Sequence, residues 1–189
     1  VDTLIVDKTG TLTVGRPTVS QVIPAEGFTG DDVLSAGASV NTGSEHPLAR
    51  AVTEAARGLP TSAAEDFEAK PGYGVSAVVD GRRVLAGNID LMRADDVLMS
   101  AELEATVPEG QTAIRVAIDG REAGLIAMRD EVKPTTPQAV EQLHEEGLTI
   151  VMATGDAAGP AKQVAETLGI DEYRAGVKPD DKLILVQDL

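Results

Sequence analysis

Residues 4–13 read Leu4-Ile5-Val6-Asp7-Lys8-Thr9-Gly10-Thr11-Leu12-Thr13, an apolar run followed by a polar turn that contains glycine. This pattern predicts a buried strand over residues 1–6 that leads directly into Asp7. In an open α/β sheet, ligands collect at the carboxyl ends of the strands. The Asp7 carboxylate therefore stands where a nucleophile is expected, although Asp, Thr and Gly are also ordinary turn residues.

The last third of the chain alternates helices and strands. Thr136 as cap and Pro137 as first residue predict a helix that Gly147 ends. A buried strand is expected over residues 148–153, a helix over 161–168 and another helix over 179–188. This alternation predicts a parallel α/β sheet.

The middle of the chain has a different pattern. Two hairpins are expected, over residues 75–86 around Asp80-Gly81 and over residues 114–127 around Asp119-Gly120. A strand over residues 18–24 and helices over 31–39 and 47–57 complete an α+β module with an antiparallel sheet. The opening strand has no parallel neighbour there. We therefore expect one discontinuous α/β domain, residues 1–16 and 128–189, into which residues 17–127 are inserted.

Composition excludes several classes of protein. The 189 residues contain no cysteine, which excludes disulfides and thiolate chemistry within them. The net charge of −15 disfavours nucleic acid as a partner. No apolar run reaches the roughly 20 residues that cross a bilayer. The chain is therefore expected to be soluble, and it is also expected to be monomeric. Both ends fall within expected regular structure, which predicts a segment of a longer protein.

A second polar cluster follows the expected strand over residues 148–153. Thr154-Gly155-Asp156 places another hydroxyl and another carboxylate at the same edge of the sheet as Asp7. Taken alone, this tripeptide is also a common helix cap.

The heptapeptide from Asp7 to Thr13 resembles the phosphorylation motif of the P-type ATPases, ion pumps whose phosphorylated domain has a haloacid-dehalogenase-like fold. The resemblance implies that Asp7 attacks the γ-phosphorus of ATP and that Asp7 and the Thr9 carbonyl hold Mg²⁺. It also implies that Asp156 supports the site, and that Asp130 is the acidic residue at the return into the domain. Contacts with the phosphoryl group are expected from Lys8, Thr11, Thr154, Gly155 and, in Pro179-Asp180-Asp181-Lys182, from Lys182 rather than Lys178.

The inserted module resembles the nucleotide pocket of the heavy-metal (P1B) branch of that family. The resemblance lies in Ser44-Glu45-His46-Pro47-Leu48, Gly72-Tyr73-Gly74 and Gly87-Asn88. With two Phe, two Tyr and no Trp, the pocket is expected to use the His46 ring and bare backbone at Gly72 and Gly74 rather than aromatic stacking. Copper members usually have a glutamate beside adenine where this chain has Asn41, which predicts a changed affinity or nucleotide preference. The expected ATP-binding residues are thus Asn41, Glu45, His46, Gly72, Gly74, Gly87 and Asn88.

Three alternatives stay open. The first is a soluble phosphatase or phosphotransferase of the same fold. Such phosphatases usually have a second Asp two positions after the nucleophile, which acts as acid and base, whereas this chain has Thr9 there. The segment could also bind ATP without chemistry, and the cargo could be Zn²⁺ or Cd²⁺ rather than Cu⁺.

For the longer protein, the resemblance implies transmembrane metal-binding helices, an actuator domain and a place for this segment at the cytoplasmic face of a membrane. It also implies a G-D-G-x-N-D segment with another Mg²⁺ ligand, which these residues do not contain.

Overall fold

The computed structural model describes residues 2–104, 106–108 and 110–177, and in these residues the chain forms two compact units. The first unit takes the described residues among 1–16, 109–112 and 130–189, and the second takes those among 17–108 and 113–129. The chain leaves the first unit after Arg16 and returns to it at Asp130. The domain bounds of 1–16 with 128–189 and 17–127 stay a prediction. Residues 110–112 also group with the first unit, which the sequence pattern does not indicate.

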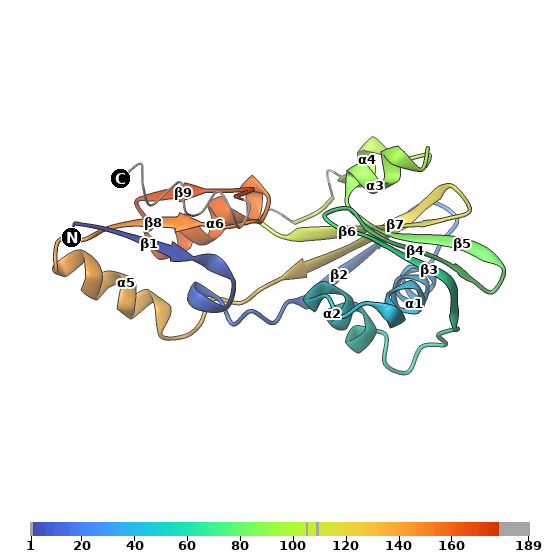
Figure 1. The fold of residues 1–189 in the computed structure, drawn as a ribbon, viewed down its shortest axis with the longest axis horizontal. Helices are drawn as coiled ribbons and strands as arrows, with labels where there is room; N and C mark the ends of the chain where they lie inside the picture. Colours follow the sequence, from blue (N-terminus) through green and yellow to red (C-terminus); the bar gives the residue numbers. More distant parts are fainter. Residues whose placement is uncertain (1, 105, 109, 178–189) are drawn as a thin grey trace. The chain divides into compact units, whose positions relative to one another are not determined.

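The first unit is built on a three-stranded parallel sheet in the order β1-β8-β9 (Figure 1). Thr3 of β1 lies opposite Thr149 of β8, and the register runs on to Asp7 opposite Ala153. The strands are β1 (Thr3–Asp7), β8 (Thr149–Ala153) and β9 (Glu172–Arg174). The parallel pairing of the opening strand with the strand before Thr154 confirms the predicted α/β fold.

Two helices accompany this sheet, α5 (Thr136–Glu145) and α6 (Ala158–Leu168). α6 packs on the sheet through the buried side chains of Ala161, Ala165 and Leu168 against Met152. The prediction that Thr136 caps α5 is wrong, because α5 starts at Thr136 and its cap is Thr135. The Thr136 hydroxyl instead donates to the Leu12 carbonyl, at 2.9 Å.

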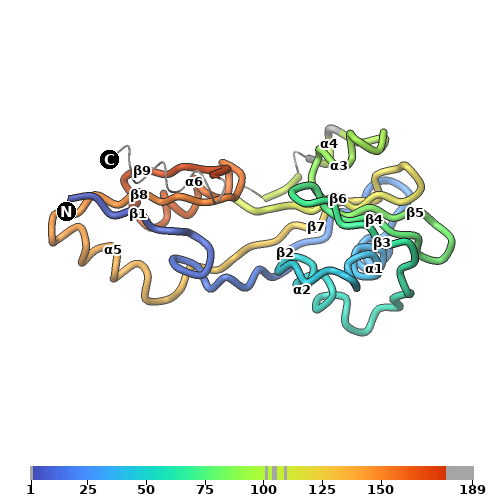
Figure 2. The backbone as a smooth tube through the Cα atoms, in the orientation of Figure 1, coloured from blue at the N-terminus to red at the C-terminus, as the bar shows by residue number. Residues whose placement is uncertain are grey.

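The second unit has a six-stranded antiparallel sheet in the order β2-β7-β6-β5-β4-β3, which the tube in Figure 2 follows. Its strands are β2 (Thr18–Pro24), β3 (Ala64–Lys70), β4 (Gly74–Val79), β5 (Arg82–Gly87), β6 (Thr112–Ile118) and β7 (Arg121–Arg129). Both predicted hairpins are present. Asp80 and Gly81 have φ of 50° and 73°, and Asp119 and Gly120 have φ of 50° and 76°, as the tight two-residue turn requires.

Helices cover both faces of this sheet (Figure 1). α1 (Gly30–Val40) and α2 (Pro47–Ala55) pack over the larger core, which includes the fully buried Val33, Val52 and Val116. α3 (Ile89–Ala94) packs on the other face, where Leu85, Met92 and Ala117 are buried. The short α4 (Ala101–Glu104) follows, and the 3₁₀ turn η2 (Asn41–Gly43) joins α1 to the segment before α2.

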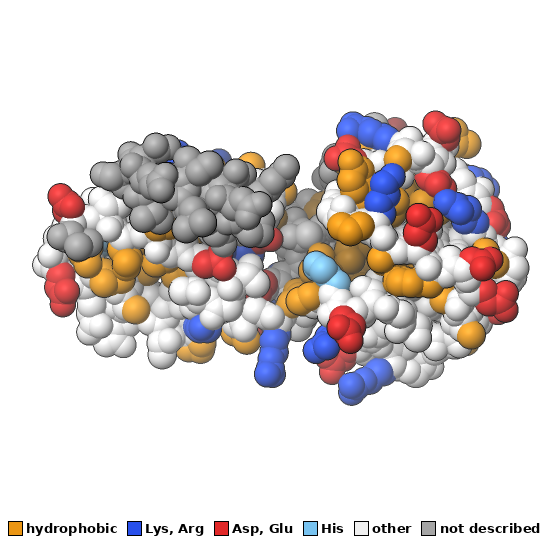
Figure 3. Space-filling model, in the orientation of Figure 1, with side chains coloured by type: hydrophobic (Ala, Val, Ile, Leu, Met, Phe, Trp, Pro, Cys, Tyr) orange, Lys and Arg blue, Asp and Glu red, His pale blue; other side chains and the backbone are white. Residues whose placement is uncertain are grey.

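None of the helices in the described part of the chain combines the length and the apolar character that a bilayer crossing needs. On the face of the second unit drawn in Figure 3, Lys and Arg side chains are interspersed with Asp and Glu. This mixed charge gives no support to a nucleic-acid surface on that face.

Candidate functional site

Asp7 is the last residue of β1 and its side chain is exposed. Because Asp7 lies opposite Ala153, the last residue of β8, Thr154 follows at the same edge of the sheet. Thr154 is almost fully buried, and its backbone N–H donates to the Arg174 carbonyl at 2.9 Å. The parallel register therefore brings the predicted nucleophile and the Thr154 turn to neighbouring strand ends.

The segment after Asp7 forms one irregular turn, η1 (Lys8–Leu12). Gly10 has φ of 78°, a left-handed conformation in which glycine is favoured. The turn closes where the Thr13 backbone N–H donates to the Lys8 carbonyl, at 3.0 Å. Thr9 and Thr11, predicted to contact the phosphoryl group and Mg²⁺, are both exposed on this turn.

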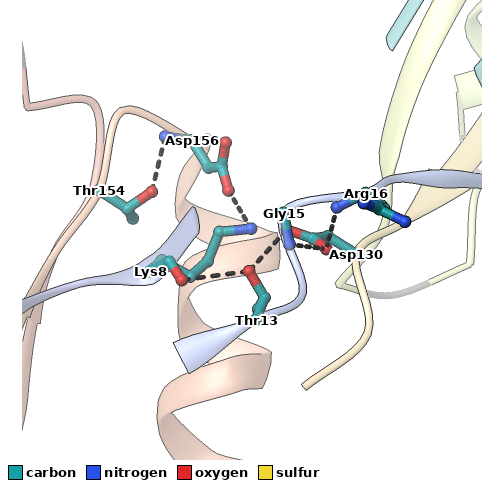
Figure 4. Close-up of polar contacts among 7 residues, drawn as sticks. All are labelled: Lys8, Thr13, Gly15, Arg16, Asp130, Thr154 and Asp156. Carbon is teal, nitrogen blue, oxygen red and sulfur yellow. Dashed lines mark hydrogen bonds and ion pairs between the residues drawn. The ribbon is translucent and has the colours of Figure 1, made fainter. Parts of the chain in front are cut away.

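A second segment, residues 130–136, holds this turn in place, and Figure 4 shows the contacts of its first residue, Asp130. The Asp130 carboxylate accepts hydrogen bonds from the Thr13 hydroxyl at 2.6 Å and from the backbone N–H groups of Gly15 and Arg16 at 2.9 and 3.2 Å. Lys133 Nζ donates to the Gly10 carbonyl at 2.5 Å. Asp130 thus binds the turn directly, and Lys133 and Thr136 are positioning residues that were not predicted for this site.

Lys8 and Asp156 form an ion pair beside Asp7's strand end (Figure 4). The Lys8 side chain is only 6% exposed, whereas that of Asp156 is 30% exposed. The Asp156 backbone N–H donates to Thr154 Oγ1 at 3.2 Å, so the pair is tied to the Thr154 turn. The structure therefore brings together four of the predicted residues: Asp7, Lys8, Thr154 and Asp156.

Gly155 lies exposed at the centre of this turn. A methyl group added there would meet, within 4 Å, only the Val177 carbonyl oxygen at 3.6 Å, which is an ordinary contact. The described protein atoms thus leave room for a methyl group at Gly155. Lys178, Lys182 and the expected helix over residues 179–188 lie outside the described residues.

The described residues offer few metal ligands at this edge. The described residues contain no group of three or more His, Cys, Asp or Glu side chains that could hold a metal ion. The Asp7 carboxylate and the Thr9 carbonyl are hard oxygen donors. Such donors fit Mg²⁺, which is commonly held by one or two carboxylates together with substrate phosphates.

In the second unit, His46 is the N-cap of α2. Its Nδ1 accepts the backbone N–H of Leu48 at 3.2 Å, and its own backbone N–H donates to Ser44 Oγ at 3.3 Å. A neutral ring that accepts at Nδ1 carries its proton on Nε2. The exposed His46 ring can therefore donate through Nε2, and Glu45 is exposed beside it.

The predicted glycines and Asn88 form one connected network. Asn88 Nδ2 donates to the Gly72 carbonyl and the Asn88 backbone N–H donates to the Tyr73 carbonyl, both at 2.8 Å. Asn88 Oδ1 accepts the Leu91 N–H at 3.0 Å and so also caps α3. Asn88 thereby fixes the turn at residues 72–74.

Packing within the sheet is a reason for glycine at positions 74 and 87 that differs from the predicted approach of a nucleotide. They lie opposite each other on β4 and β5, and a Cβ on Gly74 would stand 2.3 Å from the Ala86 carbonyl oxygen and 2.5 Å from the Gly87 Cα. The protein's own backbone thus requires glycine at Gly74. Around Gly72, no heavy atom of the described residues, apart from its own chain neighbours, lies within 4 Å of a Cβ position, which leaves bare backbone there.

Asn41 is buried at the C-terminal end of α1. Its Nδ2 donates to the Gly37 carbonyl at 2.8 Å, so the amide caps the helix. Oδ1 is then the Asn41 atom that can accept a hydrogen bond from a ligand.

Known proteins are similar to this chain over its whole length. The haloacid dehalogenase-like hydrolase family model matches residues 1–189. A copper-transporting P-type ATPase from Rhizobium leguminosarum bv. viciae is 47% identical over 194 residues, and the chain spans 23% of that relative's length.

Solved structures agree. The catalytic domain of the CPx-ATPase CopB-B, studied for conformational changes upon nucleotide binding, matches with a TM-score of 0.75 and 27% identity, over 100% of this chain and 68% of that one. A zinc-transporting PIB-type ATPase in its E2.Pi state matches with a TM-score of 0.67 and 34% identity, over 100% of this chain and 31% of that one. This chain therefore belongs to the haloacid dehalogenase-like hydrolases, and within them it is similar throughout to the catalytic part of heavy-metal P-type ATPases.

Proposed function

We propose that this chain is the ATP-binding and autophosphorylating part of a heavy-metal-exporting P-type ATPase, with Asp7 as the phosphoryl acceptor. The observation that carries the proposal is the position of Asp7, exposed at the end of β1 and opposite the residue before Thr154. A carboxylate can form an acyl phosphate, and the neighbouring hydroxyls and backbone N–H groups offset charge on the phosphoryl oxygens.

In the proposed step, one Asp7 oxygen attacks the γ-phosphorus of ATP. The new O–P bond forms as the bond between the γ-phosphorus and the β–γ bridging oxygen breaks, and ADP leaves with that electron pair. Thr9, Thr11 and Thr154 supply hydroxyl groups around the acceptor. Mg²⁺, held by Asp7 and the Thr9 carbonyl, would neutralise phosphate charge when bound.

Thr9 supports a pump rather than a soluble phosphatase. A threonine hydroxyl is a poor general base, so water receives little help in attacking an aspartyl phosphate at Asp7. Such a phosphoenzyme persists long enough to drive a conformational change.

ATP is proposed to bind to the second unit. His46 Nε2 and Asn41 Oδ1 supply a donor and an acceptor for the base, and the bare backbone at Gly72 allows close approach. Glu45, Gly74, Gly87 and Asn88 complete the proposed site, the last by holding Gly72 in place.

We propose Cu⁺ as the cargo, because the 47% identical relative is named for copper, with Zn²⁺ as the competing cargo. The longer protein would carry the transmembrane metal path and an actuator domain, with this segment at the cytoplasmic face of the membrane.

Titration calorimetry of the chain with ATP tests the nucleotide site. His46→Ala and Gly72→Val are expected to weaken binding by about 1 to 3 kcal/mol, the scale of a polar contact left unmade. Asp7→Asn should leave it unchanged. Gly81→Val is the matched control, since Gly81 also has a left-handed φ and open space but lies in a different hairpin turn. Unchanged affinity in both site variants would refute this assignment.

Labelled ATP tests the chemistry in the longer protein. We expect an acid-stable, hydroxylamine-labile phosphate that disappears in Asp7→Asn. Stimulation of ATP hydrolysis by Cu(I) above Zn(II), Cd(II) and Co(II) would support the cargo. Turnover of a generic phosphate ester without metal stimulation would favour a phosphatase.

A further inference from the structure

The edge strand β3 carries a feature that no motif indicated. Its pairing with β4 shifts register between Glu65 and Glu68, and Asp66 has φ of 51°. A left-handed conformation costs free energy for a residue other than glycine, and a bulge of this kind redirects the neighbouring side chain. The side chain next to Asp66 is Phe67, which is 37% exposed.

The ring of Phe67 lies on η2, the turn that leads to His46. A Cβ built on Gly43 would stand 3.4 Å from Cγ and Cδ1 of Phe67 and 3.5 Å from Cδ2. Three ring carbons at nearly equal distance mean that the face of the ring covers Gly43. The next residue, Ser44, is fixed to this turn because its N–H donates to the Asn41 carbonyl at 2.9 Å.

β3 therefore connects the two halves of the proposed nucleotide site. Its middle touches the segment that carries His46, and its end at Lys70 leads into the turn at Gly72. The Lys70 carbonyl accepts the Tyr73 N–H at 3.0 Å, so that turn is anchored to the same strand.

The charges beside Phe67 indicate which part of a nucleotide belongs there. Glu65, Asp66 and Glu68 are exposed on the same strand. Three carboxylates repel a triphosphate, but they do not repel a neutral purine base.

We infer that Phe67 is a positioning residue for the base-binding end of this site, which holds the Gly43–His46 segment so that His46 Nε2 faces the base. The inference rests on the proposed ATP binding. Phe67 acts on the bound nucleotide through Gly43 and His46, and the part of the nucleotide concerned is the neutral purine base.

Calorimetric titration with ATP and ¹⁵N spectra of the His46 ring test this in the same samples. Phe67→Leu removes the flat ring but keeps an apolar side chain, and Phe67→Tyr restores the ring. Phe28→Leu is the matched control, because Phe28 packs against the core of the same unit, and the guanidinium carbon of Arg121 lies 5.9 Å from the centre of its ring.

For Phe67→Leu we expect ATP binding to weaken by about tenfold, the scale of one well-made contact, with an unchanged melting temperature. The ¹⁵N shifts of His46 should move toward a mixture of the two tautomers even without nucleotide. Phe67→Tyr should restore both values, and Phe28→Leu should lower the melting temperature without changing the His46 spectrum.

If Phe67→Leu binds ATP like the wild type while His46→Ala binds weakly, the inference is wrong and the proposed function stands. Equal losses in Phe67→Leu and Phe28→Leu would also overturn it, since they would reflect general loosening. If the wild-type chain binds no ATP, the proposed function itself fails, and this inference fails with it.

Discussion

Lys8 and Asp156 form an ion pair between the turn after β1 and the turn after β8. The two ends of the pair differ in solvation, with 6% of the Lys8 side chain and 30% of the Asp156 side chain exposed. Asp156 Oδ2 is buried, and the Lys8 ammonium is its ion-pair partner. The pair therefore joins the ends of β1 and β8, two neighbouring strands of the sheet that lie far apart in sequence.

Removing either partner alone should destabilise the first unit. Asp156→Leu leaves a buried ammonium unpaired, and we expect a loss of about 3 to 5 kcal/mol in the free energy of unfolding. Lys8→Met leaves a carboxylate that is partly solvated, so its loss should be smaller, about 2 kcal/mol. Urea unfolding measures both losses.

The double variant separates stability from chemistry. Replacing both partners, Lys8→Met with Asp156→Leu, leaves no unpaired charge and should recover most of the stability. Phosphorylation of the longer protein should nevertheless be absent in the double variant, because the Lys8 ammonium is lost. A double variant as unstable as Asp156→Leu alone would argue against pairing as the cause.

Gly155 gives a second prediction. The described protein atoms leave room for a methyl group there, so Gly155→Ala should change the stability by no more than about 0.5 kcal/mol. If the bound phosphoryl group needs this space, phosphorylation of the longer protein should fall by about 100-fold.

The control for Gly155→Ala is Gly159→Ala, the same chemical change at a position in α6 with nothing within 4 Å. It should leave phosphorylation intact. Normal phosphorylation in Gly155→Ala would show that the ligand does not use this space.

Much of the fold could be predicted because its signals are local. The Asp80-Gly81 and Asp119-Gly120 turns and the boundaries of β2 follow from residues adjacent in sequence. The strand β3 was missed because its Glu65-Asp66-Phe67-Glu68 stretch lacks alternation, and its pairing with β4 is interrupted by a bulge. Edge strands of this kind are specified by tertiary pairing more than by their own pattern.

The site divides in the same way. Asp7 and Thr154 could be predicted to share an edge because parallel strands end together. The roles of Lys133 and Phe67 could not be predicted. Lys133 Nζ bonds the Gly10 carbonyl and the Phe67 ring packs on Gly43, and no sequence pattern marks contacts between side chains and such distant backbone. The packing of Gly87 against Gly74 could not be predicted either, because a sequence does not show which two glycines lie opposite each other in a sheet.

Acid stability depends on Asp171 in the first unit. Its carboxylate accepts the Ile150 N–H at 2.7 Å and contacts His144 Nε2 at 2.9 Å. The hydrogen bond from the Ile150 N–H holds the pKa of Asp171 below its ordinary value of 3.8, and the contact with His144 is the next largest cause. A depressed pKa means that the stabilisation is complete above the unfolded-state pKa and is lost as the pH falls through the folded-state value.

We therefore expect the stability of wild type to fall below about pH 4, and Asp171→Asn to show a flatter curve there. Asparagine can still accept from Ile150 but does not titrate. Glu172→Gln, which removes the neighbouring carboxylate paired with Arg174, is the control. Chemical unfolding at a series of pH values measures this, and parallel curves for wild type and Asp171→Asn would contradict it.

Asn41 distinguishes a helix cap from a contact with the base. Its Nδ2 is used by the Gly37 carbonyl, which leaves Oδ1 as the acceptor for the amino group of adenine. Asn41→Asp keeps an acceptor but places a carboxylate at the C-terminus of α1, so stability should fall by about 1 to 3 kcal/mol while the preference for ATP over GTP persists. Asn41→Ala should lose both the stability and the preference.

The control is Thr42→Ala, which removes a hydroxyl bonded to the Ser39 carbonyl at the same helix end and should affect stability alone. Competitive titration of ATP and GTP decides, because an unchanged preference in Asn41→Ala would make Asn41 a helix cap and nothing more.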